Sequence, residues 1–171
     1  MRMGIVGTGG VARKNYIPFL AGCDDVDLVY YNRTPEKAKA CAADFGGEAF
    51  ASLSDFLSSE PDSVLVLTGE MDRYAAALQI LESPPPRLFF EKPLVAEEGQ
   101  AHVSEEDFFK GRELLTQAEA AGTETAMVFN YRFFAQSRRA RRVVEERGFG
   151  SPTHVTGLVH YACWSHCIDL A

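Results

Sequence analysis

The start of the chain constrains the fold more than any other part of it. An apolar segment at residues 3–6 leads directly into a glycine-rich turn that begins at Gly7, and a segment that suits a helix follows to about Ala21. Short apolar runs with β-branched residues are typical of buried strands. A strand, a glycine turn and a helix in direct succession predict the start of a βαβ unit.

The same alternation continues to residue 130. Further strands are predicted at residues 26–31, 63–68, 87–91 and 125–130. Thr34 and Pro35 are typical of the start of a helix, which we expect to end near Gly46. Other helices are predicted at residues 71–82 and from a capping box at Ser104–Asp107 to about residue 122. Strands that alternate with helices predict an α/β fold, a doubly wound parallel sheet of the Rossmann type.

The character of the sequence changes after residue 131. Residues 136–147 predict a charged amphipathic helix, and residues 153–161 predict an extended segment. We therefore expect one domain at residues 1–131 and the beginning of another at residues 132–171. Two aromatic pairs, Phe108-Phe109 and Phe133-Phe134, are interpreted as core or interdomain packing.

Charge and hydropathy exclude several classes of function. The 171 residues include 17 Lys and Arg against 24 Asp and Glu, and a formal net charge of −7 disfavours nucleic-acid binding. The apolar runs are far shorter than the ~20 residues of a membrane span, and the one before Gly7 is too short for a signal peptide. We therefore expect a cytoplasmic protein with a small-molecule substrate and with neither a nucleic-acid nor a membrane partner.

Two local clusters suggest other chemistry. Cys163, His166 and Cys167 are potential metal ligands, but the sequence lacks a second ligand pair at zinc-site spacing. We expect no metal and reduced cysteines. Residues 138–142 include four arginines, which is typical of a nucleic-acid patch. Because i,i+4 pairs such as Arg141–Glu145 become available on a helix, a solvated helix face is the preferred interpretation.

The glycine turn fits the dinucleotide fingerprint Gly-x-Gly-x-x-Gly/Ala. In this pattern the first glycine makes the turn, the second lets the backbone approach the pyrophosphate, and the third small residue packs the helix on the strand. The N–H groups at the helix start then face the phosphates. The predicted cofactor-binding residues of this turn are Gly7, Thr8, Gly9, Gly10, Val11 and Ala12.

The end of the second predicted strand bears on the choice of cofactor. An acidic residue there would bind the ribose 2′-hydroxyl of NAD, but this chain has Asn32 followed by Arg33. An uncharged Asn32 does not repel a 2′-phosphate, and Arg33 could pair with it. This favours NADP, with NAD as the alternative. The competing interpretation makes Arg33 an ordinary solvated loop residue.

A charged tripeptide, Glu91-Lys92-Pro93, follows the buried-looking strand segment Leu88-Phe89-Phe90. It falls at the carboxyl edge of the sheet, where doubly wound folds bind ligands. A lysine desolvated beside a cofactor can donate a hydrogen bond to a substrate oxygen. The competing interpretation is an exposed loop with a turn proline.

Four motifs, in this order, resemble the Gfo/Idh/MocA family of NAD(P)-dependent oxidoreductases. They are residues 7–12, Glu91-Lys92-Pro93, Asn130-Tyr131-Arg132-Phe133 and His166-Cys167-Ile168-Asp169-Leu170, and they span nearly the whole chain. The resemblance implies that Lys92 is a catalytic residue, that Pro93 follows a cis peptide and that His166 is the general acid/base. It also implies that Thr68, Glu91, Lys92, Pro93 and Asn130 lie in the cofactor site, with Lys92 touching both the substrate and the nicotinamide.

The same resemblance interprets the two domains. Residues 1–131 would be the dinucleotide-binding domain, and residues 132–171 the beginning of an α+β substrate domain that is truncated here. Family members often associate through that second domain, so a homo-oligomer is an expectation from resemblance alone.

Two departures from the family pattern bear on activity. Many family dehydrogenases carry an aspartate four residues before the histidine, where this chain has Ala162. The loop that starts at Thr68 lacks the family's Thr-Pro…His pattern and reads Thr-Gly-Glu-Met-Asp-Arg. The leading hypothesis is an oxidoreductase that moves a hydride between NADP, or NAD, and a hydroxyl or carbonyl carbon of a sugar, polyol or related metabolite. The alternatives are a dinucleotide-binding sensor without catalysis and, through the arginine helix, a nucleic-acid binder.

Overall fold

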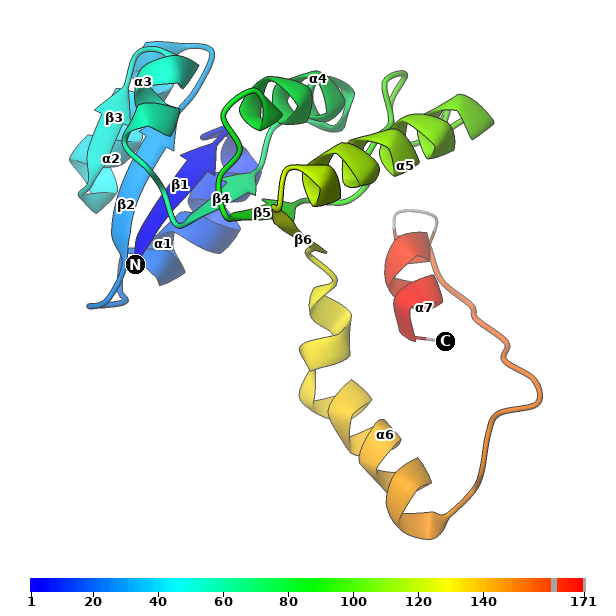
Figure 1. Ribbon diagram of the computed structural model, residues 1–171. Helices are drawn as coiled ribbons and strands as arrows, with labels where there is room; N and C mark the ends of the chain where they lie inside the picture. Colours follow the sequence, from blue (N-terminus) through cyan, green and yellow to red (C-terminus); the bar gives the residue numbers. More distant parts are fainter. Residues whose placement is uncertain (161–162, 171) are drawn as a thin grey trace. The chain divides into compact units, whose positions relative to one another are not determined.

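The computed structural model describes residues 1–160 and 163–170 (Figure 1). The chain divides into two compact units, Met1–Met127 and Val128–Ala171. The division falls just before the predicted domain boundary at residue 131.

The first unit is built on one parallel sheet. In the described part of the chain its six strands are β1 (Arg2–Val6), β2 (Asp27–Tyr31), β3 (Glu48–Phe50), β4 (Ser63–Val66), β5 (Arg87–Phe90) and β6 (Glu124–Met127). The order across the sheet is β3-β2-β1-β4-β5-β6, and every neighbouring pair is parallel. The strand order reverses between β1 and β4, which is the doubly wound topology. The predicted fold class is confirmed.

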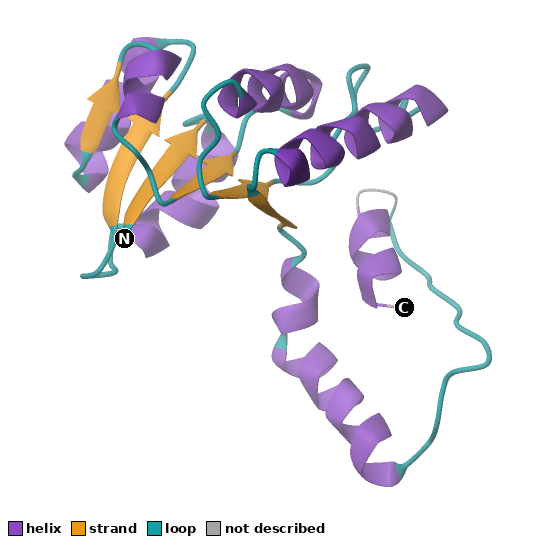
Figure 2. Cartoon of the chain, viewed as in Figure 1, coloured by secondary structure: helices purple, strands orange, loops and turns teal. Residues whose placement is uncertain are grey.

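Helices cover both faces of this sheet (Figure 2). They are η1 (Ala12–Tyr16), a π-helical turn that continues into α1 (Ile17–Leu20), then α2 (Pro35–Phe45), α3 (Leu53–Ser58), α4 (Glu70–Leu81) and α5 (Glu105–Ala120). α2 begins at Pro35 as predicted, although the Thr34 side chain makes no cap hydrogen bond. At the start of α5 the Ser104–Asp107 capping box is present, which confirms that prediction.

Two hydrophobic clusters lie on the two faces, and strand residues enter them alternately. Along β4, Val64 and Val66 belong to one cluster, whereas Leu65 belongs to the other. Successive side chains of a strand point to opposite faces, so a strand covered on both sides is apolar throughout. The first cluster packs against α3, α4 and α5, and the second against η1, α1 and α2.

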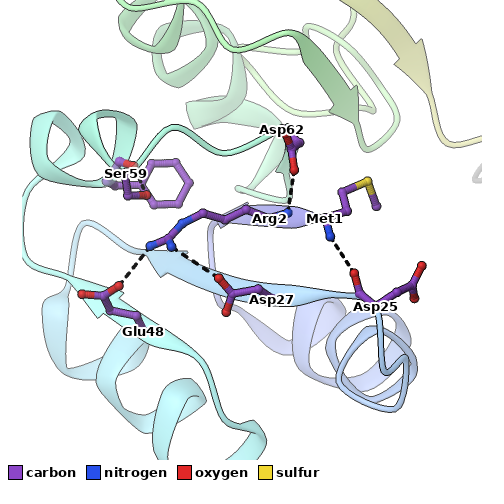
Figure 3. A network of polar contacts seen from close by, with 8 residues as sticks. Met1, Arg2, Asp25, Asp27, Glu48, Ser59 and Asp62 are labelled. Atoms are coloured by element: carbon purple, nitrogen blue, oxygen red, sulfur yellow. Dashed lines mark hydrogen bonds and ion pairs between the residues drawn. The ribbon is translucent and has the colours of Figure 1, made fainter.

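A network of ion pairs and hydrogen bonds joins the amino ends of β1, β2 and β3 and the segment before β4 (Figure 3). The Arg2 guanidinium lies 3.3 Å from the carboxylate of Asp27 at the start of β2 and 3.0 Å from that of Glu48 in β3. The Arg2 backbone N–H donates to Asp62, just before β4, at 2.7 Å. The network lies at the opposite edge of the sheet from the predicted ligand site, so we assign it a structural role.

Some expectations from the sequence were wrong. β3 and α3 were not predicted, and the strand expected at residues 125–130 ends at Met127. Phe108 and Phe109 are 59% and 53% exposed, so they are not core residues. The buried residues of α5 are Asp107, Gly111, Leu114 and Ala118. Both phenylalanines lie off this stripe, which follows the helical spacing of three and four residues.

The second unit contains three described helical segments, η2 (Asn130–Phe133), α6 (Ala135–Arg147) and α7 (Trp164–Leu170). Phe133 and Phe134 are 70% and 47% exposed, so core packing is wrong for this pair as well. α6 has no buried residue, and its Arg141–Glu145 ion pair measures 3.1 Å. Residues 154–160 are assigned to no strand. Among the described residues, no helix is long and apolar enough to cross a membrane.

Candidate functional site

The predicted site residues of the first unit gather at the carboxyl edge of its sheet. The glycine turn follows β1, Asn32 follows β2, Thr68 follows β4 and Glu91 follows β5. β1 lies between β2 and β4 in the sheet, so the turn occupies the point where the strand order reverses. Ligands of doubly wound sheets bind in the crevice at this point.

Gly7 is enclosed by backbone. Its φ is +94°, and a Cβ at this position would lie 2.7 Å from the nitrogen of Thr68 and 2.8 Å from the carbonyl carbon of Leu67. The Gly7 N–H donates to the carbonyl of Tyr31 at 3.0 Å. Gly7 therefore packs the end of β1 against the ends of both neighbouring strands, a position that only a residue without a side chain fits.

Gly9 and Gly10 face open space. No heavy atom of the described residues lies within 4 Å of a Cβ built on either one. The following Ala12 is fully buried under the sheet and begins η1. A ligand can therefore approach the backbone of this turn closely, at the point where the helical segment begins.

Asn32 is bound to the glycine turn by its side chain. Its Nδ2 donates to the Thr8 Oγ1 at 3.0 Å, and its Oδ1 accepts from the Thr34 N–H at 2.9 Å. Thr8 is buried. Asn32 therefore holds the loop after β2 against the turn after β1, which the sequence pattern did not indicate.

Arg33 forms an ion pair that the sequence pattern did not indicate. Its guanidinium lies 3.2 Å from the carboxylate of Asp72, in the first turn of α4, and its side chain is 84% exposed. The loop after β2 and the helix after β4 are thus joined by two charged side chains beside the glycine turn. Asp72 therefore places a negative charge next to Arg33, the cation that we expect to bind the 2′-phosphate of NADP.

The Glu91–Pro93 segment is held by hydrogen bonds. The Glu91 carboxylate accepts from the Tyr16 hydroxyl at 2.5 Å and from the Lys92 N–H at 2.8 Å. Burial, and secondarily the hydrogen bond to Glu91, raises the pKa of Tyr16, so this phenol stays protonated and donates. The Lys92–Pro93 peptide bond is cis, which confirms what the resemblance implied.

Arg73 is a buried charge at the same edge, also missed from the sequence. It lies in α4, is 3% exposed, and donates to the carbonyl of Thr68 at 2.7 Å and to the carbonyl of Pro93. A signal existed, since Arg73 shares the buried stripe of α4 with Ala77 and Ile80 at helical spacing. An arginine at a core position indicates a specific set of acceptors.

In the second unit, His166 is packed between aromatic rings. It is 7% exposed, stacks on Tyr131 with ring centroids 4.1 Å apart, and meets Phe129 edge-on at 6.0 Å. Asn130 begins η2 in the same unit. Lys92 belongs to the first unit and His166 to the second, so each is placed only within its own unit.

An ion pair joins η2 to α7. Arg132 contacts both carboxylate oxygens of Asp169, and this hydrogen bonding lowers the pKa of that carboxyl group. Ala162 lies outside the described residues, so the departure that it represents is not tested. Among the described residues no group of three or more His, Cys, Asp and Glu side chains could hold a metal ion, and all four cysteines are free thiols.

Solved structures with the same fold are known. A 3-ketoreductase from Actinomadura kijaniata, KijD10, crystallised with NADP and TDP-benzene, is 20% identical with a TM-score of 0.71; the match covers 85% of this chain and 42% of that one. The WlbA dehydrogenase from Bordetella pertussis, crystallised with NADH and UDP-GlcNAcA, is 22% identical with a TM-score of 0.69, covering 86% and 40%. A putative myo-inositol dehydrogenase from Sinorhizobium meliloti is 19% identical with a TM-score of 0.70, covering 88% and 42%.

The chain therefore spans less than half the length of these structures, and at such identities the similarity shows the fold alone. No curated protein matches the sequence. A family model described as an oxidoreductase family with an NAD-binding Rossmann fold matches residues 1–108, well over half of the chain. This match, with the sheet topology and the glycine turn at its switch point, shows that the chain belongs to the Gfo/Idh/MocA family of NAD-binding oxidoreductases.

Proposed function

We propose that this chain supplies the cofactor-binding part of an oxidoreductase that moves a hydride between NADP, or NAD, and a hydroxyl-bearing or carbonyl carbon of a sugar, a polyol or a related small metabolite. The observation that carries the proposal is the open space over Gly9 and Gly10 at the strand-order reversal. Glu91–Pro93 follows β5 at the same edge of the sheet.

The residues present fit a dinucleotide. Gly9 and Gly10 leave room for the pyrophosphate to approach the backbone, and Gly7 keeps the turn tight. Arg33 offers an exposed cation near the ribose position, which supports NADP over NAD. When bound, the nicotinamide would supply the hydride donor or acceptor.

Two side chains of this protein would handle the reacting oxygen and its proton. Lys92, held in the Glu91–Pro93 segment, would donate a hydrogen bond to the substrate hydroxyl or carbonyl oxygen and so stabilise developing negative charge. His166 would accept the hydroxyl proton on a ring nitrogen, or return it in the reverse direction, because histidine titrates near neutral pH.

The substrate class is inferred from structural neighbours. One is a 3-ketoreductase crystallised with a TDP compound, and another is a dehydrogenase crystallised with UDP-GlcNAcA. A third is a putative myo-inositol dehydrogenase. These descriptions support a polyhydroxylated substrate for the proposed oxidoreductase.

Cofactor binding is tested first, by calorimetric titration of the 171-residue chain with NADP and NAD. We expect NADP to bind more tightly. The second measurement follows absorbance of the reduced nicotinamide with a panel of sugars and polyols. Lys92→Ala should abolish any turnover and also lower NADP affinity, because we expect Lys92 to touch the nicotinamide, whereas Lys39→Ala, an exposed position on α2, should match the wild type. Absence of dinucleotide binding would refute the proposal.

A dinucleotide sensor without catalysis is the second candidate. The sequence observation that favours it is Ala162, which stands where many family dehydrogenases have an aspartate. Tight binding of NADP together with no hydride transfer to any substrate in the panel would support the sensor over the enzyme.

A further inference from the structure

Arg73 is the most deeply buried charged side chain among the described residues. It occupies a position in the buried stripe of α4 where an apolar residue is expected. A cation at such a position is no longer solvated by water. This burial lowers the pKa of Arg73, and the nearby Glu91 carboxylate acts in the opposite direction. Arginine nevertheless stays protonated in proteins, so its placement requires acceptors that fit the guanidinium.

The acceptors come from two different loops. One guanidinium nitrogen donates to the carbonyl of Thr68, directly after β4, at 2.7 Å, and the other donates to the carbonyl of Pro93, directly after β5. The planar guanidinium presents several N–H donors in a fixed geometry. One side chain can therefore set the separation between the loop after β4 and the Glu91–Pro93 segment, which contains Lys92.

Lys92 lies between two anchored residues. Its N-terminal neighbour Glu91 is held by the Tyr16 hydroxyl, and its C-terminal neighbour Pro93 is held by Arg73. The Lys92 N–H is itself bound by the Glu91 carboxylate. The backbone of Lys92, which we expect to donate a hydrogen bond to the reacting substrate oxygen, is thus held on both sides by buried or half-buried groups.

Two further polar atoms of this cluster are buried without a hydrogen-bond partner among the described residues, Arg73 Nε and Thr68 Oγ1. Such atoms are rare in native proteins and indicate a water or a ligand group. They add to the hydrogen-bonding capacity of the edge at which Lys92 lies.

We propose that Arg73 is a positioning residue that locks the loop after β4 to the Glu91–Pro93 segment and thereby sets the place of Lys92 at the nicotinamide end of the dinucleotide site. This inference rests on the proposed function for its effect on the cofactor. The locking of the two loops is independent of it.

The first test measures the locking without a cofactor. Hydrogen–deuterium exchange, followed by mass spectrometry, compares the wild type with Arg73→Met. The methionine side chain is also long, but it is apolar and has none of the N–H donors of the guanidinium. We expect exchange in the peptide that contains residues 87–96 to become at least tenfold faster, and exchange in the α5 peptide to stay unchanged. The control Arg112→Met removes an exposed arginine of α5 and should leave residues 87–96 as in the wild type.

The second test divides the dinucleotide into its halves. Adenosine 2′,5′-bisphosphate probes the adenosine half by calorimetry, and NADPH probes the whole site by its nicotinamide fluorescence. We expect Arg73→Met to lower NADPH affinity about tenfold and to change affinity for the bisphosphate less than twofold. Arg73→Lys, which keeps the charge with a different donor geometry, should recover part of the NADPH affinity and fluorescence.

The outcomes are distinguishable. If the wild type binds neither probe, the proposed function fails, and the exchange measurement still decides whether Arg73 locks the loops. Unchanged exchange at residues 87–96 in Arg73→Met would overturn the locking, and equal losses for both probes would overturn the positioning role. If Arg73→Met does not fold, as shown by circular dichroism, the same measurements on Arg73→Lys decide.

Discussion

The first and second glycines of the fingerprint should fail in different ways when each is replaced by alanine. In Gly7→Ala the new methyl group would lie 2.7–2.9 Å from backbone atoms of Leu67 and Thr68, and the residue would have to keep a φ of +94°. The Leu67 N–H is bound to the carbonyl of Val6 at 2.8 Å, so this backbone cannot move away without losing sheet pairing.

The two costs of Gly7→Ala can be added. A left-handed conformation costs a residue with a Cβ about 1–2 kcal/mol, and forcing an extra carbon into packed structure costs about 1–3 kcal/mol. We expect the free energy of unfolding to fall by about 2–5 kcal/mol, a large part of the ~5–15 kcal/mol of a typical domain. Urea unfolding followed by circular dichroism measures this directly.

Gly9→Ala provides the contrast. No heavy atom of the described residues lies within 4 Å of its Cβ, so the free energy of unfolding should change by less than about 0.5 kcal/mol. NADP affinity should nevertheless fall by a factor of at least ten, because the methyl group fills the space through which the pyrophosphate approaches the backbone.

Gly99→Ala separates the cost of the positive φ from the cost of the steric contact. Gly99 also has a positive φ, +86°, but no heavy atom of the described residues would touch its Cβ. It should lose only the conformational part, about 1–2 kcal/mol. The reasoning is refuted if Gly7→Ala is as stable as Gly99→Ala, or if Gly9→Ala is as destabilised as Gly7→Ala.

Three further predictions concern single side chains. Asp72→Asn should raise the affinity for NADP several-fold relative to NAD, because the Asp72 carboxylate lies 3.2 Å from Arg33 and competes with a 2′-phosphate for this guanidinium; an unchanged NADP-to-NAD ratio in calorimetry would contradict this. Asp107→Ala should lower the free energy of unfolding by about 1 kcal/mol through loss of the capping box. Hydrogen bonding, first from the Ser104 N–H, lowers the pKa of Asp107, so this stabilisation is present above the unfolded-state pKa near 4 and is lost as the pH falls through the lower folded-state value; urea midpoints that differ equally at pH 7 and pH 3 would speak against it. Tyr30→Phe should be neutral or stabilising by up to about 1 kcal/mol, because the buried Tyr30 hydroxyl has no hydrogen-bond partner among the described residues. Burial raises the pKa of Tyr30 to about 12, so the wild type should lose stability between about pH 10 and pH 12 through this group, and a Phe variant that declines equally over that range would count against the assignment.

Local patterns were enough to predict most of the first unit. The central strands β1, β2 and β4 are largely continuous apolar runs, which is what burial on both faces requires. Pro35 and the Ser104–Asp107 box act on residues that are near them in the chain. β3 is only three residues long and α3 only six, so neither has enough length to show a period.

The sequence by itself determined the fold class, the glycine turn and the position of Glu91-Lys92-Pro93 at a strand end, because each depends on neighbours in the chain. Only the tertiary structure decided that Asp72 meets Arg33 and that Arg73 joins Thr68 to Pro93. These contacts form where loops that follow different strands converge, and the hydrophobic periodicity along the chain does not reveal them. The physical reason is that the buried Arg73 guanidinium needs hydrogen-bond acceptors, and one of them, the Pro93 carbonyl, belongs to a loop twenty residues away in the chain.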